Sequence, residues 1–374
     1  MQPKNSTLPS LESLENLLAA TPDERVAQRL RKQFANAFQP HPGTYWLDLL
    51  LSTVVGWTAF YLSLHSPFGS LAYFAATIIA LIALLRATLF IHEIAHCKRG
   101  SLPGFEIAWH LFVGLPFMLP SLVYVGSHGD HHRPNVFGTA NDPEYASLAH
   151  GNILGLGRFV LGVLFVPALL VLRWGILGPL SHSIPPLRKL VVRRASTLVI
   201  NPAYSRPVPK KQHRARWIIQ EWAAALVVWL VCVSWLMGQL PMAWILKWYT
   251  VTTGMLVLNQ VRTLAAHRYR NSGRQQSLTE QLLDSINLSG WPVLTVLAAP
   301  VGLRYHALHH LLPNVPYHSL GRLHRQLQNA LPVDSSYNQA GERGILSAIQ
   351  DLVRRMRQHR TRTSVTEEHV AEEA

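Results

Sequence analysis

The chain has 374 residues, of which 49% are hydrophobic and only 14% are charged. With a mean hydropathy of +0.13, this composition indicates an integral membrane protein rather than a soluble enzyme. The net charge of +14 could suggest nucleic acid, but Lys and Arg gather beside apolar runs and are not interleaved with aromatic residues. We therefore expect a membrane surface as partner and no nucleic acid.

Two helices are predicted ahead of the first apolar run, over residues 10–20 and 21–38. In the second, Thr21 suits the N-cap and Pro22 the first helical position, and apolar residues then recur every four positions. This pattern fits an amphipathic pair lying on the membrane surface, and equally a helix packed on the protein itself. Residues 1–40 contain no apolar signal segment, so no cleavable signal peptide is expected.

Four apolar runs approach the ~20 residues that a helix needs to cross a ~30 Å hydrocarbon core; they are 46–64, 71–91, 217–239 and 243–263. Consecutive runs pair into two hairpins whose short links carry neither Lys nor Arg. The basic residues gather instead in 98–99, 188–216 and 262–274. The positive-inside rule then places these segments and both termini in the cytoplasm.

Two further apolar stretches, 105–125 and 153–173, are predicted to be interfacial or re-entrant, with breaks at Pro116, Pro120 and Pro167. If 153–173 crossed the membrane alone, the histidine-rich segments on its two sides would lie on opposite faces.

The positions of the histidines indicate the function, because eight of the 19 histidines lie in three short, closely spaced boxes. The boxes are "HEIAH" with His92 and His96, "HGDHH" with His128, His131 and His132, and "HALHH" with His306, His309 and His310. Two independent copies of H-x-x-H-H are not expected by chance. In a helix the first histidine of such a box meets those at i+3 and i+4, so each box is expected to form half of a metal site.

The predicted topology brings all three boxes to the cytoplasmic mouth of the bundle, where His267 lies one turn beyond the fourth run. Imidazole suits Fe, Zn, Cu or Ni, so the ligand type leaves the metal open. Eight or nine ligands exceed what one ion can hold but suffice for two. The predicted fold is therefore an all-α membrane protein with four transmembrane helices in two hairpins and a dimetal site at their cytoplasmic end.

Three predicted segments follow from this topology. They are cytosolic N-terminal helices over 1–44, a membrane domain over 45–325, and a cytosolic segment over 326–374. In the last, we expect a helix from Ile345 to Met356 and a disordered charged tail from Arg357.

Two other functions compete for these histidines. H-E-x-x-H is a zinc protease signature with Glu93 as general base, but that interpretation leaves both H-x-x-H-H boxes unexplained. A membrane metal carrier would place ligands near the middle of the bilayer, whereas these gather at one end. Without a protease role, Glu93 is expected to accept a hydrogen bond from a ligand imidazole.

Other polar residues near the boxes could orient ligand imidazoles in the same way. Asp142 and Glu144 in "NDPEY" could accept hydrogen bonds from ligands or form a turn. His318 lies close enough to the third box to be a further candidate.

The three boxes in order, the "FGTANDPEY" after the second and the "HHLLPNVPYHSL" around the third resemble the membrane fatty acid desaturases over residues 45–325. That superfamily also contains hydroxylases and alkane monooxygenases. The resemblance implies four transmembrane helices with a cytosolic helical cap that carries the dimetal site. It also implies that the metals are two irons and that all nine histidines, including His267, are ligands. Stearoyl-type relatives have an asparagine four residues before the ninth histidine, holding a metal-bound water, where this chain has Thr263. Either Thr263 makes the contact with that water or the second iron is supported differently.

By the same resemblance, the chain is expected to be an O2-dependent fatty acyl desaturase that introduces a cis double bond, with a lipid hydroxylase as the alternative. Electrons would come from a separate ferredoxin- or cytochrome-type protein, because no fused donor domain is visible. The acyl substrate would enter from the lipid. Arg262, Arg268 or Arg304 could hold an anionic head group, or could simply be positive-inside charges.

Overall fold

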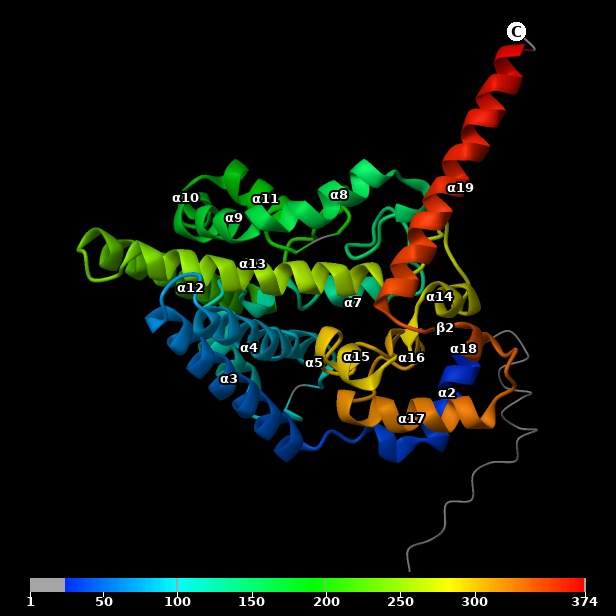
Figure 1. Ribbon diagram of the computed structural model, residues 1–374, viewed down its shortest axis with the longest axis horizontal. Coiled ribbons are helices and arrows are strands. Elements are labelled where there is room, and N and C mark those ends of the chain that lie inside the picture. Colours follow the sequence, from blue (N-terminus) through cyan, green and yellow to red (C-terminus); the bar gives the residue numbers. More distant parts are fainter. Residues whose placement is uncertain (1–23, 99, 199, 373–374) are drawn as a thin grey trace, which may run out of the picture.

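The computed structural model describes residues 24–98, 100–198 and 200–372. Nearly all regular structure is helical (Figure 1), and the described strands form one short parallel pair, β1 (Asn287–Leu288) with β2 (Gly341–Glu342). The predicted all-helical membrane fold is confirmed.

The first hairpin consists of α3 (Pro42–His65) and α4 (Leu71–Thr88), which leads into α5 (Phe90–His96). Pro42 occupies the first turn of α3, where its missing N–H costs nothing. Ser70 caps α4 by accepting a hydrogen bond from the Tyr73 N–H at 3.1 Å.

The second hairpin, α12 (Arg214–Leu236) and α13 (Met242–Leu264), lies alongside the first (Figure 1). The two hairpin tips are joined at the same end of the molecule. There the Lys247 ammonium donates hydrogen bonds of 2.8 to 3.0 Å to three carbonyl oxygens at the end of α3, those of Ser63, Leu64 and Ser66. These bonds satisfy a buried charge and fix the two hairpins in register.

Among the described residues, four helical stretches are long and apolar enough to cross a membrane: Pro42–His65, Leu71–His96, Ile153–Ser183 and Lys211–Leu236. Three of them match expected spans. The fourth expected span, 243–263, corresponds to α13, which this criterion of length and composition does not select, whereas it does select the apolar stretch from Ile153. Helix α13 is continuous over 23 residues, but polar side chains such as Lys247 and Arg262 reduce its apolar character.

The stretch from Ile153 to Ser183 is not a single regular helix. It consists of α8 (Ile153–Leu161), α9 (Val166–Leu172) and α10 (Gly178–Ser183), joined by a 3-10 turn and a π-helical turn. Pro167 lies in the first turn of α9, directly after the 3-10 turn, so the predicted break falls there.

Both ends of this stretch lie beside histidine-bearing segments. Before it, the Ala149 N–H donates to the Tyr269 carbonyl at 3.3 Å, two residues beyond the ninth histidine. After it and α11 (Pro185–Arg194), the Tyr204 hydroxyl donates to Asp130, inside the second box, at 2.9 Å. The segments before and after this stretch therefore lie close to histidine-bearing segments, as a re-entrant element requires, and the re-entrant arrangement stays a prediction.

The other predicted interfacial stretch is also broken into short pieces. It contains α6 (Phe105–Trp109), a π-helical turn and a 3-10 turn (Ser121–Val123), with Pro116 and Pro120 between the last two. The second histidine box follows in α7 (Ser127–His131).

Beyond α13 the chain folds into short helices at the histidine end of the hairpins (Figure 1); these are α14 (Leu278–Asp284), α15 (Pro292–Ala298), α16 (His306–Leu311), α17 (Tyr317–Ala330) and α18 (Ser336–Gln339). Helix α17 runs across the expected segment boundary at 325/326. The division into three segments stays a prediction.

The tail from Arg357 differs from expectation, because α19 is helical from Ile345 to Glu372. No Gly or Pro interrupts this stretch. Asp351 also forms ion pairs with Arg354 and Arg355, one turn further along the helix.

The N-terminal helix α2 (Glu24–Gln33) packs on the protein itself. Leu30 is fully buried, and Phe34 and Phe38 contact the same apolar cluster as side chains of α16 and α17. The other expected helix, over 10–20, and the cap at Thr21 and Pro22 lie outside the described residues.

Candidate metal centre

The nine predicted histidines come together as two adjoining groups of imidazoles. The first contains His92, His96, His128, His132 and His309, and the second contains His131, His267, His306 and His310. Within each group the candidate ligand nitrogens all lie within 4.8 Å of one another. Each group could hold one metal ion.

The Nε2 atoms of neighbouring rings point at a common centre. Nε2 of His96 and Nε2 of His128 are 2.9 Å apart in the first group, as are those of His267 and His306 in the second. Two nitrogens bound at right angles to one ion, each about 2.0–2.1 Å from it, are separated by about 2.9 Å. The donor set therefore fits a metal ion in each group.

The expectation that each box forms half of one site was wrong, because each H-x-x-H-H box divides between the two groups. His128 and His132 join the first group while His131 joins the second, and the third box divides in the opposite sense. Residues four apart on a helix differ by about 40° around the axis, whereas the residue at i+3 lies about 100° from that at i+4. An i, i+4 pair therefore serves one ion and the i+3 residue serves its neighbour.

Burial keeps most of the rings outside the spans in the neutral state that metal binding needs. It lowers the pKa well below 6.5 for His128, His132, His267, His306, His309 and His310. A neutral imidazole has a free lone pair to offer a metal. His131 differs: burial acts to lower its pKa, but the adjacent Asp142 carboxylate outweighs this and raises it.

Asp142 and Glu144 make the hydrogen bonds to histidines that the sequence suggested. Nδ1 of His131 donates to Asp142 at 2.9 Å, and Nδ1 of His128 donates to Glu144 at 2.8 Å. Tyr124, which the sequence did not indicate, stacks on the His128 ring with its hydroxyl 2.9 Å from Nδ1. With Nδ1 occupied, Nε2 of each ring is left to face the metal position.

Glu93 makes other contacts than expected. It accepts hydrogen bonds from the Tyr45 hydroxyl and, at 3.1 Å, from the Tyr317 N–H, while Nδ1 of His92 is 3.7 Å away. Neither ring nitrogen of His92 has a hydrogen-bond partner among the described residues. Glu93 thus joins α5 to α3 and α17, and does not orient His92 through a hydrogen bond.

His318 also lies apart from the ligand groups. Its Nε2 accepts a hydrogen bond from the His41 N–H at 3.2 Å, and its ring packs on His41 and Tyr45.

His267 is supported by residues that sequence reasoning missed. Its Nδ1 lies 3.3 Å from the Ser285 hydroxyl and 3.9 Å from the Asp284 carboxylate, both at the end of α14. They are 17 and 18 residues from His267 and belong to no histidine motif, so the sequence offers no local signal for this contact.

A cavity of about 400 Å³ opens directly onto both groups, and its lining includes five of the nine rings, those of His92, His128, His131, His267 and His306. Its wall is mostly apolar and includes Leu85 of α4, Phe159 of α8, Val166 of α9 and Met255 of α13. Thr263 lines it too, but the Thr263 hydroxyl donates to the Asn259 carbonyl at 2.8 Å and accepts from Arg262 at 3.0 Å. That Thr263 contacts a metal-bound water stays a prediction.

A second cavity, of about 610 Å³, reaches the first group through His96. Its lining includes Glu93, Cys97 and the exposed side chains of Arg31 and Lys98, so it is more polar and more basic than the first.

These features define a class: helical multi-pass membrane proteins whose paired histidine clusters can bind metal beside an apolar cavity. The chain belongs to the fatty acid desaturase family, whose sequence model matches residues 68–340. It is 40% identical over 319 residues to a ceramide hydroxylase of Caulobacter vibrioides (strain NA1000 / CB15N), covering 85% of this chain and 90% of that relative. No solved structure matches it. The protein is therefore an oxidoreductase of the desaturase and hydroxylase superfamily.

Proposed function

We propose that this protein is an O2-dependent hydroxylase that acts on a ceramide-like lipid. The observation that carries the proposal is the 40% identity, over 85% of the chain, to a protein named ceramide hydroxylase. From the sequence alone we favoured a fatty acyl desaturase and kept the hydroxylase as the alternative. The likeness to this relative supports the alternative better.

The cofactor in this proposal is a pair of iron ions, one held by the five-histidine group and one by the four-histidine group. When bound, the metals supply reductive activation of O2 and attack on an unreactive C–H bond, which no side chain can perform. The overall reaction is R–H + O2 + 2 e⁻ + 2 H⁺ → R–OH + H2O. The two electrons come from a separate ferredoxin- or cytochrome-type protein.

The chain itself positions the metals and the lipid. Asp142 and Glu144 hold the rings of His131 and His128 by hydrogen bonds to Nδ1. The apolar side chains of the 400 Å³ cavity exclude water and keep an alkyl chain beside the ligand rings.

Desaturation is the second candidate, favoured by the family description that covers residues 68–340. Both outcomes use the same ligands and differ in whether the lipid gains an oxygen atom or loses two hydrogen atoms. Purified protein supplied with ceramide, a reduced donor and isotopically labelled O2 separates them. Label in the lipid product supports the hydroxylase, whereas an unlabelled product with a new double bond supports the desaturase and contradicts our proposal.

We also propose that the metal centre and both termini face the cytoplasm. The basic segment 188–216 packs against the second histidine box, where the Tyr204 hydroxyl donates to Asp130 at 2.9 Å. Charge and metal centre therefore share one side, and the positive-inside rule assigns that side to the cytoplasm. Labelling of single cysteines placed at 238–241 and in α19, in intact cells, tests this: reagent that cannot cross the membrane should reach only the first.

A further inference from the structure

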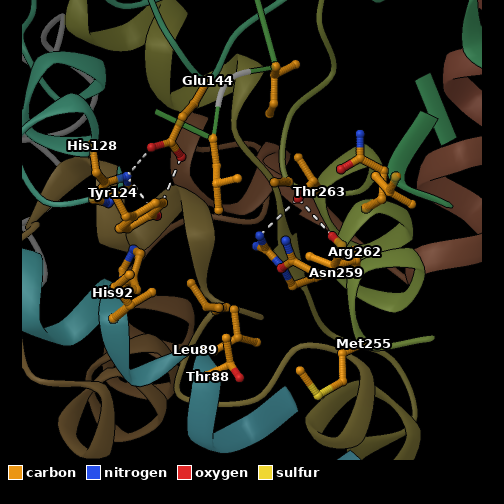
Figure 2. Close-up of a pocket in the computed structure, with 18 of the residues that line it drawn as sticks. Thr88, Leu89, His92, Tyr124, His128, Glu144, Met255, Asn259, Arg262 and Thr263 are labelled. Atoms are coloured by element: carbon orange, nitrogen blue, oxygen red, sulfur yellow. Dashed lines mark hydrogen bonds and ion pairs between the residues drawn. The ribbon is translucent and has the colours of Figure 1, made fainter. Parts of the chain in front are cut away.

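The cavity is apolar along most of its wall but polar where it meets the histidines. In Figure 2, Arg262, Asn259 and Thr263 line one side and Tyr124, His128 and Glu144 the other, with Leu89 and Met255 at a distance from both sets. Tyr124 and Glu144 contact the ligand His128, but among the described residues Arg262 and Asn259 make no hydrogen bond to a ligand histidine. A cavity built only to hold the middle of an alkyl chain at the metals would not need these two residues, because an alkyl chain offers them no hydrogen bonds.

Arg262 is the strongest of these polar groups. Its side chain is only partly buried, and among the described residues its hydrogen-bond partners are neutral: Nε donates to the Asn259 side chain at 3.1 Å and Nη2 to the Thr263 hydroxyl at 3.0 Å. A cation in an apolar cavity is costly unless additional acceptors reach it. A substrate oxygen in the cavity would be such an acceptor.

The other two arginines that could have held a head group are already engaged elsewhere. Arg268 donates to Glu342 at 2.6 Å, and Arg304 donates to the Leu288 carbonyl at 3.0 Å. Of the three, only Arg262 lines the cavity.

The groups around the cavity match a neutral, two-sided hydrogen-bonding ligand. Arg262 can donate hydrogen bonds, the Asn259 amide can both donate and accept them, and the Glu144 carboxylate can accept them. The ligand should therefore carry both hydrogen-bond donors and acceptors. A fatty acid carboxylate only accepts, and it would face Glu144 across the cavity. A coenzyme A head group carries several phosphates, for which the cavity lining supplies a single arginine.

We propose that Arg262, Asn259 and Glu144 form a subsite for the amide and hydroxyl groups of a ceramide-like lipid, next to the metals. This rests on the proposed function and deepens it. Because the polar group is held beside the ligand histidines, the carbon presented to the metals lies within a few bonds of the amide. The new hydroxyl is therefore introduced near the head group and not in the middle of the alkyl chain.

Binding tests the subsite independently of turnover. Arg262→Met removes the donor at similar length, Arg262→Lys keeps the charge, and Arg158→Met is the matched control, because Arg158 is exposed on α8. We expect Arg262→Met to bind a short-chain ceramide about 10- to 100-fold more weakly than the wild type. The ceramide affinity of Arg262→Lys should lie between those of Arg262→Met and the wild type, and the affinity of Arg158→Met should equal that of the wild type. Binding of an alkane of equal length should be the same in all four proteins.

Product analysis tests the consequence for position. In the wild type the hydroxyl should lie near the amide, and in Arg262→Met it should be spread along the chain. Equal ceramide binding by Arg262→Met and wild type, or a hydroxyl at mid-chain in the wild type, would overturn the subsite. Should Arg262→Met fail to fold, Arg262→Lys and Asn259→Ala provide the same comparison.

The two proposals can fail separately. Amide-dependent binding that is lost in Arg262→Met supports the subsite even if ceramide is never hydroxylated, in which case the proposed function alone is wrong. Hydroxylation of ceramide with no dependence on Arg262 leaves the function standing and removes the subsite.

Discussion

The Asp142 carboxylate lies 2.9 Å from Nδ1 of His131, and both side chains are almost completely buried. Such a contact fixes the ring orientation and makes Nε2 a stronger metal ligand. Asp142→Asn should therefore weaken metal binding by the four-histidine group about 10- to 100-fold. Titration of metal-free protein with Fe²⁺ measures this. Asn141→Ala changes the exposed neighbouring residue and should bind like the wild type. An unchanged affinity in Asp142→Asn would show that His131 needs no such partner.

Substitution of one histidine from each group tests the assignment of these residues as metal ligands. His131→Ala should remove a ligand from the four-histidine group and His309→Ala one from the five-histidine group. We expect each variant to insert normally, to bind less iron per chain and to form no product. Iron analysis of the purified variants, alongside product measurement, checks this. Product formation at the wild-type rate in either variant would contradict the assignment.

Six of the nine histidines were predictable because H-x-x-H-H is rare and local spacing alone identifies it, whereas His267 could be proposed only from its position beyond the fourth apolar run and from the resemblance. How the nine divide between two ions was not predictable, because that depends on how three helices face one another. His128 and His131 are three residues apart, yet they belong to different groups. Spacing along one helix sets angles around its axis, but only the packing of α5, α7 and α16 decides where two centres fall between them.

The residues that contact the histidine rings show the same limit of prediction from sequence. Asp142 and Glu144 follow the second box closely and could be proposed, whereas Asp284 and Ser285 reach His267 only through the fold of α14.

Membrane segments were predicted well where the apolar run was long and uniform. At Ile153–Ser183, length and composition suit a span, and the re-entrant prediction rested instead on keeping the histidine boxes on one face; hydrogen bonds of the flanking segments agree with that prediction. Such long-range contacts leave no mark in hydropathy.

Glu221 is a buried carboxylate on α12 whose removal should destabilise the protein strongly. It pairs with Arg173 at 2.6 Å and with Arg188 at 2.7 Å, and thereby ties the stretch Ile153–Ser183 and α11 to α12. Glu221→Ala would leave the buried Arg173 without its counter-ion, at a cost of about 3–5 kcal/mol. Unfolding of the detergent-solubilised protein measures this loss. Arg274→Ala breaks the exposed pair with Glu280 and should change little. Similar effects of the two substitutions would argue against a structural role for the buried pair.

Gly56 allows the two helices of the first hairpin to approach closely. A Cβ at this position would lie 2.6 Å from Cγ of the buried Leu84 on α4, and 3.3 Å from the Leu84 backbone nitrogen. Small residues at such contacts let helix backbones approach in membranes. Gly56→Ala should therefore push α4 away from α3 and destabilise the protein by about 1–3 kcal/mol, in spite of the higher helix propensity of alanine.

Gly43, near the start of the same helix, is the matched control, because a Cβ there has no neighbour within 4 Å. Gly43→Ala should be neutral or slightly stabilising. The double variant Gly56→Ala with Leu84→Ala removes the atoms that the new Cβ would meet, so its destabilisation should be smaller than the sum of the two single effects. Because α4 leads into α5 with His92 and His96, Gly56→Ala should also lower iron binding by the five-histidine group. Equal stability of Gly56→Ala and Gly43→Ala would mean that α3 and α4 are less closely packed than described.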